Sequence, residues 1–372
     1  MRIEPFRMER WQSTYENEVE INLSDSGVSP MTIGELVSEV GVDGLLDHRL
    51  VYTQSNGTRQ LRDAIAGLYE GATEANVEAT NGGAEANFVA AWTLVQPGDE
   101  VVMQLPNYMQ LWGVLRSIGA DVKPWRLRPD HAAGDWTCDL DELEELVTHQ
   151  TKMICICNPN NPAGSVLGAG ELDRIAAIAA RHGAWVLVDE IYIGTEQDGV
   201  PTPSMWGRHD RVVVTNSFSK TYGLPGLRLG WILAPDETIA DCWSQHDYLT
   251  IGPGSLSNDL GVHALDPKVR ARILERTKGL LKNNLDLTMS WVDADPHLTA
   301  IRPRAGAYLM MEYAHKMNSS KLAERLRVEK DLLLVPGDHF GMDGWLRVGY
   351  GEDTDLLERG LARIHELLDA LE

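Results

Sequence analysis

A lysine flanked by hydroxyl side chains is the strongest chemical feature of this sequence. Ser217, Ser219 and Lys220 follow the apolar residues 212–214, and Arg228 comes eight residues after the lysine. A short, continuous apolar run indicates a buried strand, which delivers these side chains into a glycine-containing turn. An amine there can be held as a Schiff base while the hydroxyls and the guanidinium bind an anion. A surface turn with a solvated lysine is the alternative interpretation.

A carboxylate at the end of another apolar run is the second chemical feature. Asp189 follows residues 185–188, which indicate a buried strand, and Tyr192 comes soon after it. A buried carboxylate costs free energy unless a cation pairs with it. Asp189 is therefore a candidate partner for a cationic group of a bound molecule. The alternative is that it caps the helix that follows the strand.

Two glycines mark a candidate anion site at the start of a helix. Gly82 and Gly83 precede the apolar residues 88–92, which predict that helix. The free backbone amides of Gly83, Ala84 and Glu85 are expected at its positive end, where phosphate is the natural ligand. A tight turn is the alternative role of the glycines. The glycine patterns of nucleoside-triphosphate and dinucleotide sites are absent from the sequence, which disfavours ATPase and dinucleotide-binding functions.

Several segments resemble those of the fold-type I pyridoxal-phosphate enzymes of the aminotransferase class I and II family. S-F-S-K followed by G-L-R-L-G-W, in residues 217–231, looks like the family's lysine segment. Residues 158–164, N-P-N-N-P-A-G, resemble its N-P-N-N-P-T-G, with alanine in place of threonine. The matching segments run in order from Tyr52 to Arg347. The resemblance implies pyridoxal 5'-phosphate as the cofactor and an α/β fold, with a large domain built on a mostly parallel sheet flanked by helices and a smaller α+β C-terminal domain.

The resemblance also assigns the contacts of the cofactor. It implies that Lys220 carries the cofactor and moves the α-proton, that Asp189 keeps the pyridine nitrogen protonated, and that Tyr108 stacks on the ring. Asn161 and Tyr192 are expected at the phenolic oxygen. The residues expected at the phosphate are Gly83, Ala84, Glu85, Ser217, Ser219, Arg228 and, from the neighbouring subunit of a homodimer with shared active sites, Tyr52. Core packing is the alternative for Tyr108, and a buried position at a helix entry is the alternative for Tyr52.

The substrate contacts follow from the same resemblance. Arg347 resembles the arginine that binds the substrate α-carboxylate, for which a guanidinium fork gives direction as well as charge; an exposed strand arginine is the alternative. Asp25 and Gly27, in S-D-S-G, lie where the family passes an extended stretch over the substrate, and a simple turn is the alternative. Asn161 is a further candidate for the substrate. Asp25 can pair with a cation, so we expect a basic or polar amino acid, with an arginine-derived one favoured.

The reaction itself has more than one candidate. The main prediction is an aminotransferase that acts on an L-amino acid through an internal lysine aldimine and a quinonoid, with a 2-oxo acid as possible second substrate. The alternative is elimination or cyclisation of a hydroxylated arginine-like amino acid, because residues 1–16 and the D-Y-L-T loop look similar to the subgroup related to capreomycidine synthase. The fold does not decide between them. A non-catalytic regulator is disfavoured, because the chain is acidic and has no basic DNA-binding domain.

The elements that position these residues form two domains. Strand and helix patterns alternate over residues 78–234, which predicts a mostly parallel sheet with helices on both faces and ligands just after the strands. A long helix over 268–292 leads to strands near 307–312, 332–335 and 345–348. We expect an N-terminal segment, 1–40, that packs on the small domain and covers the active site, a large cofactor-binding domain, 41–267, and a small C-terminal domain, 268–372.

Composition narrows the class of protein. The chain has 372 residues with 24% charged and 43% hydrophobic, which is typical of a globular enzyme, and its net charge of -22 disfavours nucleic-acid and membrane binding. The N-terminus lacks a signal-peptide pattern and no apolar stretch reaches about 18 residues, so a cytoplasmic location is expected. Cys155 and Cys157 alternate with isoleucine and are expected to be core thiols. Their spacing does not fit a zinc site, and no metal is expected.

Overall fold

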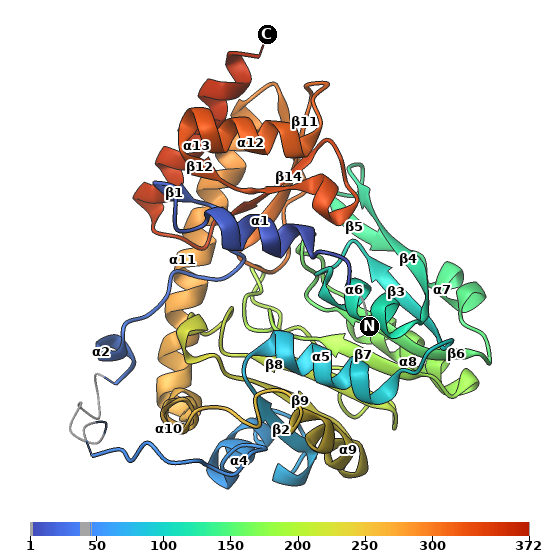
Figure 1. Cartoon of the computed structure of the whole chain (residues 1–372). Coiled ribbons are helices and arrows are strands. Elements are labelled where there is room, and N and C mark those ends of the chain that lie inside the picture. The colour runs from blue at the N-terminus through green and yellow to red at the C-terminus, as the bar shows by residue number, and fades with distance from the viewer. Residues whose placement is uncertain (1–2, 38–44, 46, 372) are drawn as a thin grey trace.

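A sheet of eight strands forms the centre of the computed structural model, which describes residues 3–37, 45 and 47–371 (Figure 1). In their order across the sheet, the strands are β2 (Val77–Thr80), β9 (Gly230–Leu233), β8 (Val212–Ser217), β7 (Trp185–Asp189), β6 (Thr151–Cys157), β3 (Glu100–Leu105), β4 (Asp121–Asp130) and β5 (Asp135–Cys138). The pairs β8–β7, β7–β6, β6–β3 and β3–β4 are parallel. The predicted mostly parallel sheet is therefore confirmed.

The two edges of this sheet are antiparallel, which strict strand–helix alternation does not predict. β9 runs antiparallel to both β8 and β2, and β5 runs antiparallel to β4. A parallel pair needs a crossover of a dozen or more residues, usually a helix. The segment between β8 and β9 contains only the single turn η2 (Pro225–Leu227), and a tight turn joins β4 to β5. The lysine turn therefore lies at the carboxyl end of β8, in a segment without an α-helix, residues 218–229, after which the chain reverses into β9.

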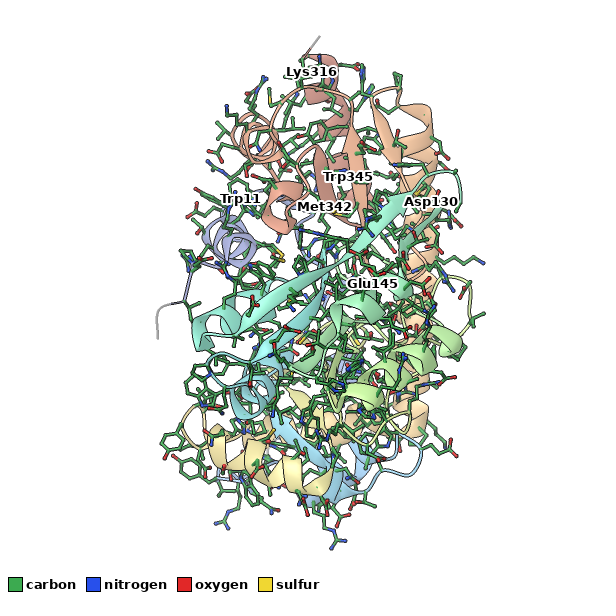
Figure 2. The ribbon with its side chains drawn as sticks, turned by 90° about the vertical axis from the view of Figure 1, so that its right-hand side faces the viewer. Trp11, Asp130, Glu145, Lys316, Met342 and Trp345 are labelled. Carbon is green, nitrogen blue, oxygen red and sulfur yellow. The ribbon has the colours of Figure 1, made fainter. Side chains whose placement is uncertain are left out.

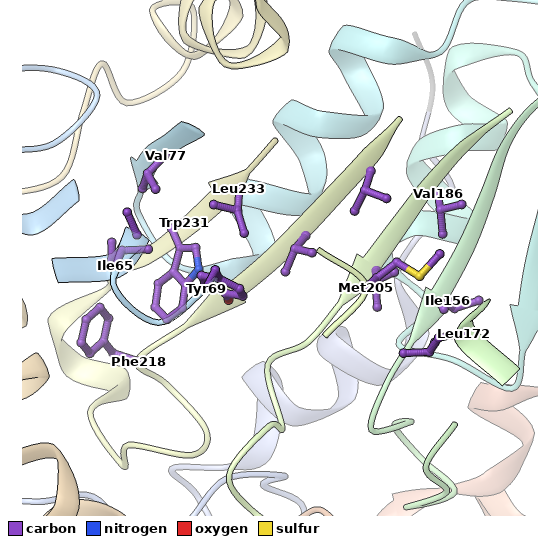
Figure 3. Packing of buried hydrophobic residues seen from close by; sticks show 14 of the residues in the cluster. Ile65, Tyr69, Val77, Ile156, Leu172, Val186, Met205, Phe218, Trp231 and Leu233 are labelled. Carbon is purple, nitrogen blue, oxygen red and sulfur yellow. The ribbon is translucent and has the colours of Figure 1, made fainter. Parts of the chain in front are cut away.

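Helices cover both faces of the sheet. The first face packs on α4 (Arg59–Ala66), α7 (Leu140–Leu146), α8 (Ala169–His182) and α10 (Ser255–Leu265). The second packs on α5 (Gly83–Leu94), α6 (Gln110–Ile118) and α9 (Asp236–His246). Figure 3 shows the first face, where Ile156 of β6 lies next to Leu172 of α8. Because strands buried on both faces need apolar side chains throughout, they read as continuous apolar runs in the sequence.

Two details inside this domain bear on the expectations from the sequence. Cys155 and Cys157 are buried and unpaired, as expected of core thiols. The helix α6 that follows β3 begins at Gln110, five residues after the strand ends at Leu105. The side chain of Asn107 donates to the carbonyl of Gln104, 3.1 Å away, and this local turn replaces the first helical turn.

The smaller C-terminal unit is an antiparallel sheet in the order β10–β11–β14–β13. Its strands are β10 (Leu298–Ala300), β11 (Tyr308–Tyr313), β13 (Val335–Pro336) and β14 (Trp345–Gly349), with helices α12 (Ser319–Lys330) and α13 (Thr354–Asp369) and the turn η3 (Gly337–Phe340). The strand predicted near 332–335 is divided: β12 (Leu332–Leu333) pairs with the N-terminal strand β1 (Ile21–Asn22), and β13 pairs with β14. The N-terminal segment thus becomes part of the small unit.

Two extended elements are among the segments that join the two sheets. Helix α11 (Pro267–Ala294) runs along one side of the molecule from the large unit to the small one (Figure 1). The β4–β5 ribbon reaches the small sheet elsewhere, with Asp130 near its tip and Trp345 close by in Figure 2. Trp136 of the ribbon packs on Trp345 at 5.4 Å between ring centroids, within a buried apolar cluster that includes Met310. The ribbon is therefore a second attachment of the small sheet.

The N-terminal helix α1 (Arg7–Tyr15) packs on the small unit. Met8 is buried against Val335 and Phe340, and the Trp11 indole donates to the carbonyl of Leu334 at 2.8 Å. The helix ends where residues 16–18 offer no apolar side chain to continue the packed face. A short helix, α2 (Ile33–Leu36), follows. The boundary expected at residues 40 and 41 lies outside the described residues.

The described part of the chain contains neither a membrane-spanning helix nor a cluster of metal-binding side chains. None of its helices combines the length and apolar character needed to cross a membrane. Its histidine, cysteine, aspartate and glutamate side chains form no group of three or more suited to a metal ion.

Candidate functional site

A cavity of about 350 Å³ lies at the carboxyl ends of the central strands. It is bounded by the start of α5, the segments after β3, β6, β7 and β8, and helix α1 from the N-terminus. The site residues expected from the sequence that line it are Asp25, Gly83, Ala84, Tyr108, Asn161, Asp189, Tyr192, Ser219, Lys220 and Arg228. Carboxyl ends of parallel strands are where open α/β sheets bind ligands, and this sheet follows that rule.

Lys220 lies beside the N-terminal segment. Its Nζ is 2.8 Å from Asp25 Oδ1, which also accepts a hydrogen bond from the Gly27 backbone N–H at 2.8 Å. The Lys220 ammonium outweighs the effect of burial and holds the pKa of Asp25 well below its usual range. A Cβ on Gly27 would come within 3.2 Å of Lys220 Cδ, so a glycine allows the segment to lie against the lysine. The structure brings all three residues together.

Asp189 is a buried carboxylate held by two hydrogen bonds. Asn87 Nδ2 donates to Oδ2 at 3.0 Å, and the Ile191 backbone N–H donates to Oδ1 at 3.1 Å. No ion pair joins Asp189 to a cation within residues 3–37, 45 and 47–371. Burial raises the pKa of its carboxyl group above the usual value. A cationic group entering the cavity therefore finds a carboxylate that has no other partner of opposite charge.

Asn87 was not predicted as a site residue. Its Oδ1 accepts the Thr215 hydroxyl at 2.6 Å, which orients the amide so that Nδ2 faces Asp189. The sequence contained a signal for it, because Asn87 is a polar residue directly before the apolar residues 88–92 of a buried helix. A buried amide in such a place needs hydrogen-bond partners.

Asn161, Tyr192 and Ser26 form a buried chain of hydrogen bonds. Asn161 Nδ2 donates to the Tyr192 hydroxyl at 3.1 Å, and that hydroxyl donates to Ser26 Oγ at 2.9 Å. Burial raises the pKa of Tyr192, so its hydroxyl stays protonated. Ser26 was missed by the sequence reasoning, although its neighbours Asp25 and Gly27 were selected. The three side chains come from separate segments and present an amide and a hydroxyl to the cavity.

Arg347 lies directly behind Asn161 on strand β14. It is 1% exposed, so the alternative of an exposed strand arginine is wrong. Nη1 donates to Asn161 Oδ1 at 2.9 Å and Nη2 to the Ser24 carbonyl at 2.6 Å, whereas Nε has no hydrogen-bond partner. Burial lowers the pKa of this guanidinium. None of the carboxylates in the described chain forms an ion pair with it, so Arg347 is suited to receive one from a ligand.

The start of helix α5 and Arg228 form the anion side of the cavity. Gly82 has a φ of 93°, and a Cβ there would approach Arg228 Nη2 to 2.6 Å, so only glycine fits. The Arg228 guanidinium donates to backbone carbonyls, those of Pro225 at 3.2 Å and Asn81 at 3.5 Å. Ser217 Oγ accepts the Ser219 backbone N–H at 3.1 Å. Helix amides, a hydroxyl and a guanidinium thus converge at one end of the cavity.

Three predicted cofactor residues are placed differently from the rest. Tyr52 is 95% exposed and lies in another hollow, so the alternative of a buried tyrosine is wrong. The Glu85 side chain is hydrogen-bonded to His246 and does not line the cavity. Tyr108 lines the cavity, but its ring packs edge-on against Phe6 at 5.1 Å.

Helix α1 contributes side chains that the sequence reasoning did not select. Glu9, Gln12 and Glu16 line the cavity, and Gln12 Nε2 donates to the Ser24 carbonyl at 2.7 Å. Burial, followed by the nearby charges of Glu9 and Asp25, raises the pKa of Glu16. The spacing of these residues by three and four places them on one helix face, which is a signal that the sequence carries. The mouth of the cavity is therefore acidic.

Comparisons with known proteins agree along the length of the chain. The sequence profile of the aminotransferase class I and II family matches residues 38–364. Capreomycidine synthase from Streptomyces vinaceus is 30% identical over 376 residues, covering 97% of this chain and 93% of that protein. A PLP-dependent aminotransferase from Streptococcus suis 89-1591 superposes with a TM-score of 0.93 at 31% identity, covering 100% and 99% of the two chains. The PLP-dependent cyclase OrfR superposes at 0.91 with 25% identity and the same coverage.

Proposed function

The chain belongs to the aminotransferase class I and II family, and from that membership we propose that it is an aminotransferase acting on an L-amino acid with a basic or polar side chain. Its cofactor is pyridoxal 5'-phosphate. The observation that carries the proposal is that an amine, Lys220, and a buried carboxylate without a cationic partner, Asp189, line one cavity of the described chain. A buried guanidinium without a carboxylate partner, that of Arg347, lies directly behind Asn161 in the wall of this cavity. These are the groups that amino-acid chemistry with this cofactor requires.

The side chains of the cavity fit this cofactor. The buried Asp189 carboxylate suits a protonated pyridine nitrogen, which supplies the missing positive charge. The start of α5 and Arg228 present N–H donors suited to a phosphate. Asn161 and Tyr192 offer an amide and a hydroxyl to a phenolic oxygen.

The roles of the chain's own groups follow from their positions. When bound, pyridoxal phosphate supplies an electrophilic aldehyde and a ring that withdraws electrons from the substrate Cα. Lys220 Nζ would hold the cofactor through its aldehyde carbon and would serve as the base that moves the proton of the substrate Cα. Asp189 would keep a proton on the ring nitrogen, and Arg347 would bind the α-carboxylate and so orient the Cα–H bond. Asp25, in contact with Nζ, stabilises the protonated amine.

Product analysis tests transamination directly. The purified protein, given an amino acid and a 2-oxo acid, is expected to form the 2-oxo acid of the first and the amino acid of the second in equal amounts. A reaction that needs no 2-oxo acid and releases a cyclic or unsaturated product contradicts transamination.

Cyclisation or elimination is the second candidate. It is supported by the full-length similarity to capreomycidine synthase and to the cyclase OrfR. It uses the same lysine, aspartate and arginine, and differs in whether a leaving group departs from the substrate side chain after Cα is deprotonated. Incubation with a hydroxylated arginine-like amino acid alone, followed by mass spectrometry for loss of water, separates the two candidates.

The substrate preference leads to a prediction for Asp25. We expect Asp25→Asn to weaken the use of a cationic amino acid by roughly a hundredfold in kcat/KM, because losing the partner of a desolvated ion pair costs ~3 kcal/mol or more. A neutral amino acid of similar length should be affected much less. Glu9 and Glu16 at the same cavity support the assignment of a cationic substrate.

The comparison between the two substrates separates this role from the contact of Asp25 with Lys220. A carboxylate that serves only the lysine affects the cationic and the neutral substrate alike. Equal losses for the two substrates, or a preference of the wild-type enzyme for aspartate or glutamate as amino donor, would contradict recognition of a cationic side chain.

We also propose a homodimer with shared active sites. Large apolar side chains are exposed around a hollow of about 440 Å³, including Leu50 (85%), Tyr52 (95%) and Ile251 (50%). Exposed apolar patches of this kind mark interfaces, and a second copy of the chain is the partner that the family favours. Tyr52 is then free to reach the phosphate of the partner's site.

Mixed dimers test the shared site. Lys220→Ala and Tyr52→Phe subunits are each expected to have little activity. One of the two sites in each mixed dimer has both residues intact, so pure mixed dimers should have about half of the wild-type activity. Random mixing, in which half of the dimers are mixed, should give about a quarter of it. The measurement is activity after the subunits have been exchanged, with each variant alone as control. Failure to complement, with Tyr52→Phe impaired and mixed dimers present, counts against the proposal, as does a monomer at working concentration.

A further inference from the structure

His246 lies between two carboxylates behind the start of helix α5. The imidazole is fully buried at the end of α9. Its Nδ1 is 2.8 Å from Glu78 Oε1 on β2, and its Nε2 is 3.0 Å from Glu85 Oε2 on α5. Ionised carboxylates only accept hydrogen bonds, so a ring that faces two ionised carboxylates carries a proton on each nitrogen. His246 joins β2, α5 and α9, and in its imidazolium form it donates to both carboxylates.

The electrostatics of the group agree with this geometry. Burial opposes the charge on the ring, but the hydrogen bonds with Glu78 and Glu85 outweigh it and raise the pKa of His246 to about 9. Burial also opposes ionisation of Glu85, yet its hydrogen bonds, the one with His246 first, lower the pKa of Glu85 to about 2. Burial raises the pKa of Glu78 and of the neighbouring Cys242 thiol, and the charge of Asp247 adds to the effect on Glu78.

Glu85 in turn holds the loop that enters helix α5. Its Oε2 accepts the Asn81 backbone N–H at 2.6 Å, and its Oε1 accepts the Thr250 hydroxyl at 2.7 Å. Asn81 Nδ2 also donates to Thr250 Oγ1 at 2.6 Å. These bonds fix the approach to Gly82, whose backbone lies against Arg228. The carboxylate that shapes the anion side of the cavity therefore carries a charge of the same sign as a phosphate.

We propose that His246 is a positioning residue for the phosphate of the cofactor: its positive charge offsets that of Glu85, so that Glu85 can hold the loop with less repulsion of the phosphate at the start of α5. The inference rests on the proposed function, because it requires a phosphate at the amides of Gly83 and Ala84. In a partly dehydrated site, an unneutralised carboxylate on the first turn of the helix opposes a doubly charged anion.

The test uses two ligands that cannot form a Schiff base. Pyridoxine 5'-phosphate and pyridoxine differ only in the phosphate. The dissociation constant of pyridoxine divided by that of pyridoxine 5'-phosphate, both for the cofactor-free enzyme, therefore measures what the phosphate contributes to binding. We expect His246→Gln to reduce this ratio about tenfold, as the loss of one nearby charge predicts. Adding Glu85→Gln to His246→Gln removes the uncompensated carboxylate while keeping a side chain of the same shape whose oxygen can still accept the Asn81 backbone N–H. The double variant is expected to recover most of the ratio.

Each outcome decides the matter. An unchanged ratio in His246→Gln, or no recovery in the double variant, overturns the role of His246, as does equal weakening of both ligands, which indicates a purely structural effect. A wild-type enzyme that binds both ligands equally contradicts the phosphate site itself, and with it the proposed function.

Should His246→Gln fail to fold, the same ratio measured against pH in the Lys220→Ala protein decides. That background lacks the cavity amine, so its titration does not contribute. The ratio should hold steady up to about pH 9 and fall above it, because the positive charge on His246 is present below its raised pKa and lost above it. A ratio that stays constant through this range overturns the inference.

Discussion

A Lys220→Ala enzyme is expected to lose covalent attachment of the cofactor and to be slower by roughly 10²–10⁴-fold or more, the contribution typical of a positioned general base. Lys220 is the one lysine among the described residues that line the cavity, so none of the other lining residues can form the imine in its place. The wild-type enzyme should show an imine absorption band, and borohydride should fix the cofactor to Lys220 in a peptide identified by mass spectrometry.

The control for this prediction is Lys278→Ala, which removes an exposed lysine from helix α11. It should keep both the absorption band and the rate. A Lys220→Ala protein that still carries a reducible, covalently bound cofactor would remove Lys220 from the proposed mechanism.

Replacing Asp189 with asparagine is expected to lower kcat/KM by roughly 10²–10³-fold, because breaking a buried ion pair costs about 3–5 kcal/mol. Asparagine has nearly the same shape, but it carries no charge for a protonated ring nitrogen. The new side-chain amide also directs an N–H donor at one of the two groups that donate to Asp189, Asn87 Nδ2 or the Ile191 backbone N–H, so one of these hydrogen bonds is lost. Steady-state kinetics at saturating cofactor measures the loss, and a cofactor titration measures the affinity.

Asn87→Ala is the matched comparison for Asp189→Asn. It removes one hydrogen bond from Asp189 and leaves the carboxylate charged, so its effect should be about tenfold, the size of a single hydrogen bond to a charged group. An Asp189→Asn enzyme within a factor of about five of wild type, or a larger loss in Asn87→Ala, is inconsistent with a charge-based role for Asp189.

The sequence was most informative where a polar residue ends an apolar strand. Asp189 and Lys220 could be selected because carboxyl ends of parallel strands share one edge of a sheet, and the structure places them around one cavity. The antiparallel direction of β9 was harder to foresee, since it depends on how short a connection the chain can make. The division of the strand near 332–335 depends on pairing with the distant residues 21–22.

Contacts between distant segments explain what the sequence could not supply. Ser26 meets Tyr192, and His246 meets Glu78 and Glu85, only after α1, α9 and the sheet have packed. No local pattern specifies such pairs, because each partner alone is an ordinary polar residue. Asn87 differs, because an amide beside an apolar helical run already signals that a buried partner must exist.

Helix α11 and the β4–β5 ribbon both constrain how the small sheet can move. Helix α11 holds it on one side, and the β4–β5 ribbon, through Trp136 and Trp345, holds it elsewhere. Arg347 and helix α1 both pack within the small unit, so a movement of the small sheet displaces them together. Such a movement also has to break contacts with the large unit, among them the hydrogen bond from Arg347 Nη1 to Asn161 Oδ1.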